Sequence, residues 1–368
     1  MYTEIIKIIE GGLVNDREKV INYANVLADN LESQGELSLA KKIRSTLNKR
    51  RGSLTSLDSF STRPVDAESR MDIVEVTTPQ IEAPQVILSK YSQDAIHGFV
   101  ESYTHRDVLL KSGLDVTNSL LLYGPPGCGK TTVAQYISSL TGLPLVTARL
   151  DGLVSSLLGS TAKNIRKIFD YASRRECILF LDEFDVIAKL RDDKNELGEL
   201  KRVVNSLIQN IDTFNNDSIL IAATNHHELL DPAIWRRFTT IVSLEKPQKE
   251  EIKRLLTILL QDKENNFMES ERKCTGVIDA LLGFSHSDIK TVTFNAIREV
   301  ILSDRSILTN CDMLKSIFFY KNHAIENEDE LIEYLLKNGV THKELNDSLV
   351  IPLRKIQGIS KKIDRREL

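Results

Sequence analysis

Short apolar runs alternate with helical patterns through the central part of the chain. The runs occupy residues 119–123, 143–150, 177–183 and 218–225, and each is rich in Leu, Ile and Val. A strand that is apolar along its whole length is buried on both faces, which is typical of a parallel sheet covered by crossover helices. The pattern therefore predicts an α/β fold with a doubly wound parallel sheet in residues 86–246.

After Pro247 the pattern changes to helix alone. Apolar residues recur at three- and four-residue steps in EEIKRLLTILLQDK, VIDALLG and SDIKTVTFNAIREVIL. This spacing predicts amphipathic helices. We expect residues 247–325 to form an all-helical lid beside the sheet domain, and residues 326–368 to form a helical C-terminal tail.

Two further segments precede the sheet domain. Residues 1–48 carry apolar positions at helical spacing, which predicts a small N-terminal helical domain. This domain either packs as a bundle or docks a partner. Residues 49–85 begin with a stretch rich in Ser, Thr and charge and poor in periodic apolar residues, which is typical of a flexible linker.

The composition is that of a globular protein with room for two or three domains. The 368 residues are 41% hydrophobic and 27% charged, and the net charge of −4 does not indicate a general nucleic-acid-binding surface. The four cysteines are scattered, without the spacing of a zinc site or a disulfide framework. The first residues lack the pattern of a signal peptide, and no apolar run approaches the ~20 residues of a membrane span. We therefore expect a cytoplasmic protein without a membrane partner.

One glycine-rich segment carries a specific chemical signal. Residues 124–131 satisfy the pattern GxxxxGK(S/T) and lie between a predicted strand and a predicted helix. In such a loop the backbone N–H groups face phosphates, the lysine adds positive charge, and the last hydroxyl is a ligand of Mg²⁺. The residues that we expect to bind the nucleotide in this segment are Gly124, Pro125, Pro126, Gly127, Cys128, Gly129, Lys130, Thr131 and Thr132.

Polar residues follow two of the other predicted strands. Asp182 and Glu183 come at the end of an apolar run, where one carboxylate can hold Mg²⁺ and the other can orient or activate a water molecule. Asn225 ends the next run, where it can contact both a γ-phosphate and the attacking water. Further on, Arg236 and Arg237 stand side by side before the apolar segment TTIVSL.

Together these motifs resemble those of the AAA family of AAA+ ATPases over residues 86–310. GPPGCGKT is similar to the Walker A motif, FLDEFD to Walker B, and ATNHHELLDPAIWRRF to sensor 1 followed by the arginine-finger segment. The resemblance implies a ring, usually a hexamer, with ATP bound between subunits. It assigns phosphate and Mg²⁺ binding to Lys130 and Thr131, Mg²⁺ binding to Asp182, polarisation of water to Glu183, γ-phosphate sensing to Asn225, and insertion into the neighbouring site to Arg237 and Arg236.

Two segments depart from the family's pattern. The residues that align with the central-pore loop are Leu157, Leu158 and Gly159, and Leu157 stands where members that thread proteins usually have an aromatic residue. The lid motif usually reads Ser-Gly-Ala-Asp, whereas here His286 and Ser287 occupy the middle positions. We expect both residues to lie near the nucleotide, with His286 either stacked on the adenine or only beside it.

The C-terminal tail has the spacing of two short helices joined by a turn, with Thr341 starting the first and Pro352 the second. From Pro352 to Leu368 there are six basic and two acidic residues. A basic second helix is compatible with DNA binding. The alternative is a tail that packs against the lid or a neighbouring subunit.

The leading functional hypothesis is an ATPase that converts ATP and water to ADP and phosphate, assembles into a homo-oligomeric ring and remodels a protein partner. The chain contains no recognisable protease or nuclease domain, and similar single-module ATPases occur in bacteria beside separate effectors, including proteases in defence-type pairs. Two alternatives remain at this stage. One is an ATP-gated DNA-binding regulator that uses the basic tail, and the other is a slow ATP-dependent assembly switch that controls a separate effector.

Overall fold

The structure of the chain is a computed structural model. The residues described are 5–7, 17–33, 39–41, 44, 63–65, 72–80, 82–114, 118–150, 158–186, 197–214, 217–322, 328–349 and 351–364. Among them, no helix is both long enough and apolar enough to cross a membrane.

A six-stranded sheet forms the centre of the described chain, in the order β1-β3-β4-β5-β2-β6. The strands are β1 (Glu75–Thr77), β2 (Ser119–Tyr123), β3 (Leu145–Arg149), β4 (Ile178–Asp182), β5 (Ile219–Thr224) and β6 (Thr240–Ser243). Every neighbouring pair is parallel except β1 and β3, which are antiparallel. The predicted α/β fold with a mainly parallel sheet is confirmed.

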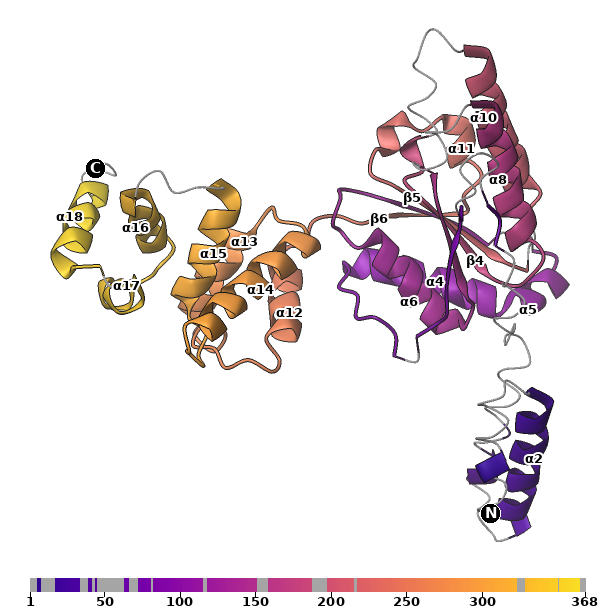
Figure 1. The fold of residues 1–368 in the computed structure, drawn as a ribbon, viewed down its shortest axis with the longest axis horizontal. Coiled ribbons are helices and arrows are strands. Elements are labelled where there is room, and N and C mark those ends of the chain that lie inside the picture. Colours follow the sequence, from indigo (N-terminus) through magenta and orange to yellow (C-terminus); the bar gives the residue numbers. More distant parts are fainter. Residues whose placement is uncertain are drawn as a thin grey trace.

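Helices cover both faces of the sheet (Figure 1). One face packs against α4 (Lys90–Thr104) and α6 (Lys130–Thr141), and the other against α8 (Leu158–Ala172) and α10 (Leu197–Asp212). In β2, Leu120 and Leu122 belong to the first core and Leu121 to the second, because successive side chains point to opposite faces. This double burial explains why the strands are apolar along their whole length. The short elements α5 (Arg106–Lys111), η3 (His227–Leu229) and α11 (Pro232–Trp235) connect these layers.

The edge strand β1 lies inside the range that the sequence assigned to a linker, so that assignment is wrong for these residues. Glu75 pairs with Thr147 and Thr77 with Leu145, and the preceding Ile73 and Val74 are buried. A three-residue strand gives too short an alternation to stand out in the sequence. Its stability comes from pairing with β3 and from the core on one face.

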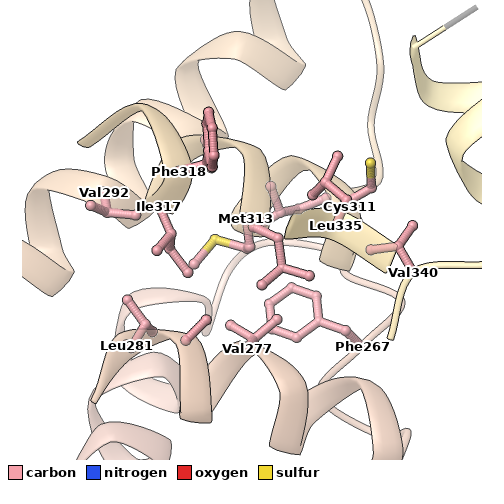
Figure 2. Packing of buried hydrophobic residues seen from close by; sticks show 14 of the residues in the cluster. Phe267, Val277, Leu281, Val292, Cys311, Met313, Ile317, Phe318, Leu335 and Val340 are labelled. Atoms are coloured by element: carbon pink, nitrogen blue, oxygen red, sulfur yellow. The ribbon is translucent and has the colours of Figure 1, made fainter. Parts of the chain in front are cut away.

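The helices after the sheet are α12 (Lys249–Leu259), α13 (Glu271–Leu281), α14 (His286–Leu302), α15 (Asn310–Asn322), α16 (Glu328–Lys337), α17 (His342–Leu349) and α18 (Leu353–Asp364). They share one hydrophobic cluster, which extends from Ile252 to Ile359. Figure 2 shows Leu335 and Val340 beside Cys311 and Phe267 in this cluster. Side chains on both sides of residue 325, the predicted boundary between lid and tail, therefore pack into the same core.

The tail helices are fixed by local contacts as well as by this core. Thr341 and Glu344 exchange backbone and side-chain hydrogen bonds at the start of α17, which is a capping-box arrangement. The amide of Asn346 donates to the carbonyl of Ile351 at 2.8 Å and closes the turn to α18. In α18, Ile356 and Ile359 are buried.

At the N-terminal end, α2 (Arg17–Ser33) has the predicted apolar face, on which Ala24, Ala28 and Leu31 are buried. Its exposed side carries Asp29 and Glu32, and the guanidinium of Arg44 binds both carboxylates at 2.6 and 2.8 Å. These contacts join α2 to a residue 12 to 15 positions further along the chain.

Candidate functional site

The polar residues predicted from the sequence gather at one edge of the sheet. Strands β4, β5 and β2 are neighbours and run parallel, so their carboxyl ends lie side by side. Asp182 is the last residue of β4, Asn225 follows β5, and the glycine-rich loop follows β2. The crevice beyond the carboxyl ends of such strands is the usual place for a ligand in open α/β sheets.

The glycine-rich loop needs glycine at two positions for different reasons. Gly124 has a φ of 143°, and a Cβ atom there would lie 2.1 Å from the carbonyl oxygen of Leu244. Gly127 has a φ of 74°, and its Cβ would lie 2.5 Å from the hydroxyl of Ser285. The loop thus approaches both the end of β6 and the lid so closely that side chains are excluded. Pro126 is exposed, and Pro125 and Thr132, the latter in the first turn of α6, are half-buried.

Lys130 is the first residue of α6 and is buried. Its Nζ donates to the carbonyl oxygens of Gly124 at 2.7 Å and Pro125 at 3.0 Å, so the ammonium group lies inside the curve of the loop. Burial lowers the pKa of this amine, and the nearby carboxylates of Asp182 and Asp185 oppose that effect. The helix N-terminus adds further positive potential at the same place.

Thr131 and Asp182 form an oxygen pair that suits Mg²⁺. The Thr131 hydroxyl lies 3.5 Å from Oδ2 of Asp182, and Oδ1 of Asp182 accepts a hydrogen bond from the backbone N–H of Glu183 at 2.9 Å. Mg²⁺ prefers such hard oxygen ligands and is commonly held by one or two protein oxygens together with phosphates and water. The two side chains predicted to bind the metal are therefore brought together.

Glu183 has a φ of 53°, in the left-handed region that is unfavourable for a residue with a Cβ atom. The surrounding contacts hold it there: the Phe184 N–H donates to the Ala223 carbonyl at 2.9 Å, and the Val186 N–H donates to the Glu183 carbonyl at 3.0 Å. Phe184 is itself fully buried. Backbone strain of this kind tends to occur at functional sites, where the fold fixes a side chain in a required direction.

Asn225 lies beside a carboxylate that the sequence analysis did not assign. The backbone N–H of Asn225 and the hydroxyl of Thr224 both donate to Oδ1 of Asp185, at 3.4 and 3.1 Å. The side-chain oxygen of Asn225 is buried and has no hydrogen-bond partner among the described residues. Asp185 is the last acid of FLDEFD, so its position in that motif is the only signal that could have identified it.

The two adjacent arginines have different surroundings. Arg237 is half-buried and donates to both carboxylate oxygens of Asp212 at 3.0 and 3.3 Å, and also to the carbonyl of Ala233. Arg236 is exposed, and its guanidinium has no ion pair or hydrogen bond within the described part of the chain. The ring of the preceding Trp235 packs edge-on against Tyr123, with centroids 5.7 Å apart.

The lid reaches the glycine-rich loop through the start of α14. Ser285 caps this helix, and the backbone N–H of Ser287 donates to the carbonyl of Gly127 at 3.1 Å. Tyr320 and Ser285 both donate to Asp288, and these bonds lower the pKa of its carboxyl although burial acts in the opposite direction. The lid residues predicted to lie near the nucleotide are thus next to the loop.

His286 lines a cavity of about 230 Å³ between the lid and the segment before α4. Both ring nitrogens are buried, and burial lowers the pKa of the imidazole, although the Glu251 carboxylate and the backbone of Ile87 act in the opposite direction. Cys128 is buried at the same cavity, where burial raises the pKa of its thiol. Residues that contribute to the lining are Ile87, Tyr91, Cys128, Lys246, Glu251 and His286.

The predicted pore residues belong to the first residues of α8 and the position before them in the sequence. Leu157 lies outside the described residues. Leu158 and Gly159 are the first two residues of α8, and their side chains are likewise outside the description.

Comparison with known proteins agrees with this geometry. Residues 120–246 match the family described as "ATPase family associated with various cellular activities (AAA)". An uncharacterized AAA family ATPase of Sinorhizobium fredii is 38% identical over 250 residues, which cover 68% of this chain and 74% of that protein. Proteasome-activating nucleotidase 2 of Haloferax volcanii is 27% identical over 289 residues, covering 74% of this chain and 67% of that protein.

The similarity extends to a eukaryotic protein. The 26S protease regulatory subunit 6A of Caenorhabditis elegans is 32% identical over 225 residues, which are 58% of this chain. The matched region spans about half of that relative, 52% of its length.

Proposed function

Since the chain belongs to the AAA family of ATPases, we propose that it hydrolyses ATP to ADP and phosphate and uses the reaction to remodel a protein partner. The observation that carries the proposal is the convergence of Lys130, Asp182, Glu183 and Asn225 at one edge of the parallel sheet. Asp182 and Glu183 come from the end of β4, Asn225 follows β5, and Lys130 begins the helix that follows β2 and the glycine-rich loop. A phosphate loop alone supports binding, whereas the acids and the amide supply what hydrolysis needs in addition.

The residues present divide the work of hydrolysis between them. The loop N–H groups and Lys130 bind the phosphates. When phosphate is bound, the amine of Lys130 exchanges its hydrogen bonds to the carbonyls of Gly124 and Pro125 for bonds to phosphate oxygens. Thr131 and Asp182 would hold Mg²⁺, which supplies neutralisation of phosphate charge when bound. Glu183 orients the attacking water and accepts its proton, and the amide oxygen of Asn225 fixes the water's position.

We assign the arginine supplied to a neighbouring subunit to Arg236. Its guanidinium is exposed and unengaged within the described chain, whereas that of Arg237 is bound to Asp212. Arg237 then holds the corner between α11 and β6 from which Arg236 projects. An arginine provided in trans stabilises the charge of the transition state, and it contributes on the order of 10³–10⁵ in rate in other NTPases. This division of roles requires a homo-oligomeric ring, for which a hexamer is the form we propose.

The partner that we propose is a separate protein. The relatives named proteasome-activating nucleotidase and 26S protease regulatory subunit act, by their names, on protein-degrading assemblies. A separately encoded protease or its substrate is therefore the partner class to test first. The basic tail offers less support for DNA binding, because Ile356 and Ile359 of α18 are buried in the lid core and Lys355 is paired with Glu328 and Asp329.

The direct test is Glu183→Gln in the full-length chain. This variant should bind MgATP with wild-type affinity but release no phosphate, because the carboxamide cannot accept the proton from water. Used as bait in the presence of ATP, it should retain a protein partner that wild-type protein releases. Wild-type rates of phosphate release by the variant would overturn the assignment of Glu183.

DNA is tested with substitutions that leave the lid core intact. Arg354 and Lys361 are exposed on α18, so Arg354→Glu with Lys361→Glu reverses charge without removing buried side chains. We expect no DNA stimulation of ATP turnover in either wild type or this variant. Stimulation that the variant loses would favour the regulator over the remodeller.

A further inference from the structure

A buried carboxylate joins the ends of two neighbouring strands at the proposed catalytic edge. Asp185 follows β4, is only 3% exposed, and accepts hydrogen bonds from Thr224 and Asn225 at the end of β5. Burying a carboxylate is unfavourable unless hydrogen bonds compensate it. A buried acid between two strand ends that both carry proposed catalytic residues calls for a role beyond packing.

The contacts of Asp185 fix the backbone on both sides of the Asn225 side chain. The Thr224 hydroxyl that donates to Asp185 also accepts a hydrogen bond from the backbone N–H of His226 at 3.0 Å. One chain of hydrogen bonds therefore restrains residues 224, 225 and 226 together. Within it, the side-chain oxygen of Asn225 is buried without a partner among the described residues, and so remains able to accept a hydrogen bond from water.

The end of β5 is also bonded to the turn after β4, which contains Glu183. The Phe184 N–H donates to the carbonyl of Ala223, one residue before Thr224, so the turn after β4 and the end of β5 are linked at two places. Movement of one strand end would then displace the other. Errors of about 1 Å in the placement of reacting groups can cost on the order of a hundredfold in rate.

We propose that Asp185 is a positioning residue for hydrolysis, which holds the amide of Asn225 in register with Glu183 across the ends of β4 and β5. The inference rests on the proposed ATPase function and adds a residue to its machinery. Asp185 acts through Asn225 and does not itself contact the substrate. Its negative charge also lies near Lys130, where it opposes the loss of the proton that burial favours.

The test is a double-mutant cycle on the full-length chain with MgATP, using Asp185→Asn, Asn225→Ala and the double variant. Asp185→Asn keeps the shape of the side chain but removes its charge. We expect it to lower kcat about tenfold to a hundredfold while KM changes less than about threefold. In the Asn225→Ala background the same substitution should cost almost nothing further, because the group it positions is gone.

A conservative pair at Thr224 supplies a second test that does not alter the carboxylate. Thr224→Val removes the hydroxyl but keeps the volume, so kcat should fall. Thr224→Ser keeps the hydroxyl and should retain most of the wild-type kcat. Asp262→Asn, an exposed acid in the lid, is the matched control and should leave kcat within about twofold of wild type. Thermal unfolding of each variant separates loss of position from loss of fold.

The outcomes distinguish this inference from the function on which it rests. Additive losses in the cycle, or a fall in kcat that simply follows a fall in melting temperature, would overturn the positioning role while leaving ATP hydrolysis in place. Unchanged kcat in both Asp185→Asn and Thr224→Val would overturn it as well. If wild-type protein released no phosphate from MgATP under any condition that supports assembly, the proposed function and this inference would fall together.

Discussion

Arg237 donates two hydrogen bonds to the carboxylate of Asp212, at 3.0 and 3.3 Å, while the adjacent Arg236 projects from the same corner without an ion pair in the described chain. Two neighbouring residues of the same type thus have separate surroundings. Because α10 ends at Asp212 and α11 ends at Trp235, the ion pair links the corner before β6 to a helix on the face of the sheet.

Substitution of each arginine should give a different result. Arg236→Ala should lower kcat at least about a hundredfold in the assembled protein without changing the melting temperature, because it removes only a charge offered to the next subunit. Arg237→Ala should destabilise the chain by up to about 1 kcal/mol, as expected for a partly exposed ion pair.

The decisive measurement for this pair is a mixing experiment. Arg236→Ala subunits with an intact Glu183 should regain turnover when combined with Glu183→Gln subunits that still carry Arg236. Recovery in mixtures made with Arg237→Ala instead, and none with Arg236→Ala, would reverse the assignment.

The contact between lid and loop can be tested with one methyl group. In Gly127→Ala the added Cβ would meet the Ser285 hydroxyl at 2.5 Å, at a φ of 74° that favours glycine. We expect weaker ATP binding, by about tenfold, because the loop must shift and the bond from Ser287 to Gly127 is disturbed.

Gly98→Ala is the matched control for this change. Gly98 lies within α4, and a Cβ atom there would meet no atom within 4 Å. Alanine should therefore stabilise the helix by about 0.5–1 kcal/mol and leave nucleotide affinity unchanged. Calorimetric titration with ATP and thermal unfolding report the two quantities, and equal affinity in the two variants would contradict the close contact.

His286 predicts a dependence of stability on pH. Burial holds the pKa of its imidazole below the ordinary value of about 6.5, so the folded state disfavours protonation. The stability that this neutral ring contributes is present above the unfolded pKa and is lost as the pH falls through the folded pKa. The free energy of unfolding should therefore decline below about pH 6.5 more steeply in wild type than in His286→Gln.

Denaturant titrations at pH 7.5 and 5.5 measure this difference. Other titrating groups such as Asp288 are present in both proteins, so their contributions cancel in the comparison. Parallel curves for wild type and His286→Gln would show that the ring is not shielded as the structure indicates.

The packing of the tail separates a structural role from a surface role. Ile356 is fully buried in the lid core, whereas Leu353, three residues earlier on the same helix, is 45% exposed. Ile356→Ala should cost about 2–4 kcal/mol, and Leu353→Ala less than about 1 kcal/mol. A single cooperative transition for residues 247–364 should follow from their shared core, and similar small losses in both variants would argue for a detached tail.

Several features of this protein follow from local sequence pattern. Runs such as SLLLY and CILFLDE indicated the buried strands β2 and β4, because a parallel strand between two helical layers has apolar residues on both faces. The glycine-rich loop was recognisable for a related reason, since Gly124 and Gly127 adopt backbone angles and close contacts that few other residues tolerate. The same strand predictions placed Lys130, Asp182 and Asn225 at or after the carboxyl ends of strands.

Other features depended on residues far apart in the sequence. Only its place in FLDEFD marks Asp185 in the sequence, and its hydrogen bond with Thr224, 39 residues later, forms only where β4 lies beside β5. The choice between Arg236 and Arg237 likewise depends on Asp212, 25 residues away from Arg237. The short strand β1 is defined by its pairing with β3. The tail packs against the lid because Ile356 and Leu335 are buried in the same hydrophobic cluster as the lid residues. Periodicity and turn chemistry are properties of neighbours in the chain and could be read there, whereas hydrogen bonds, ion pairs and core contacts between distant segments exist only after the chain has packed.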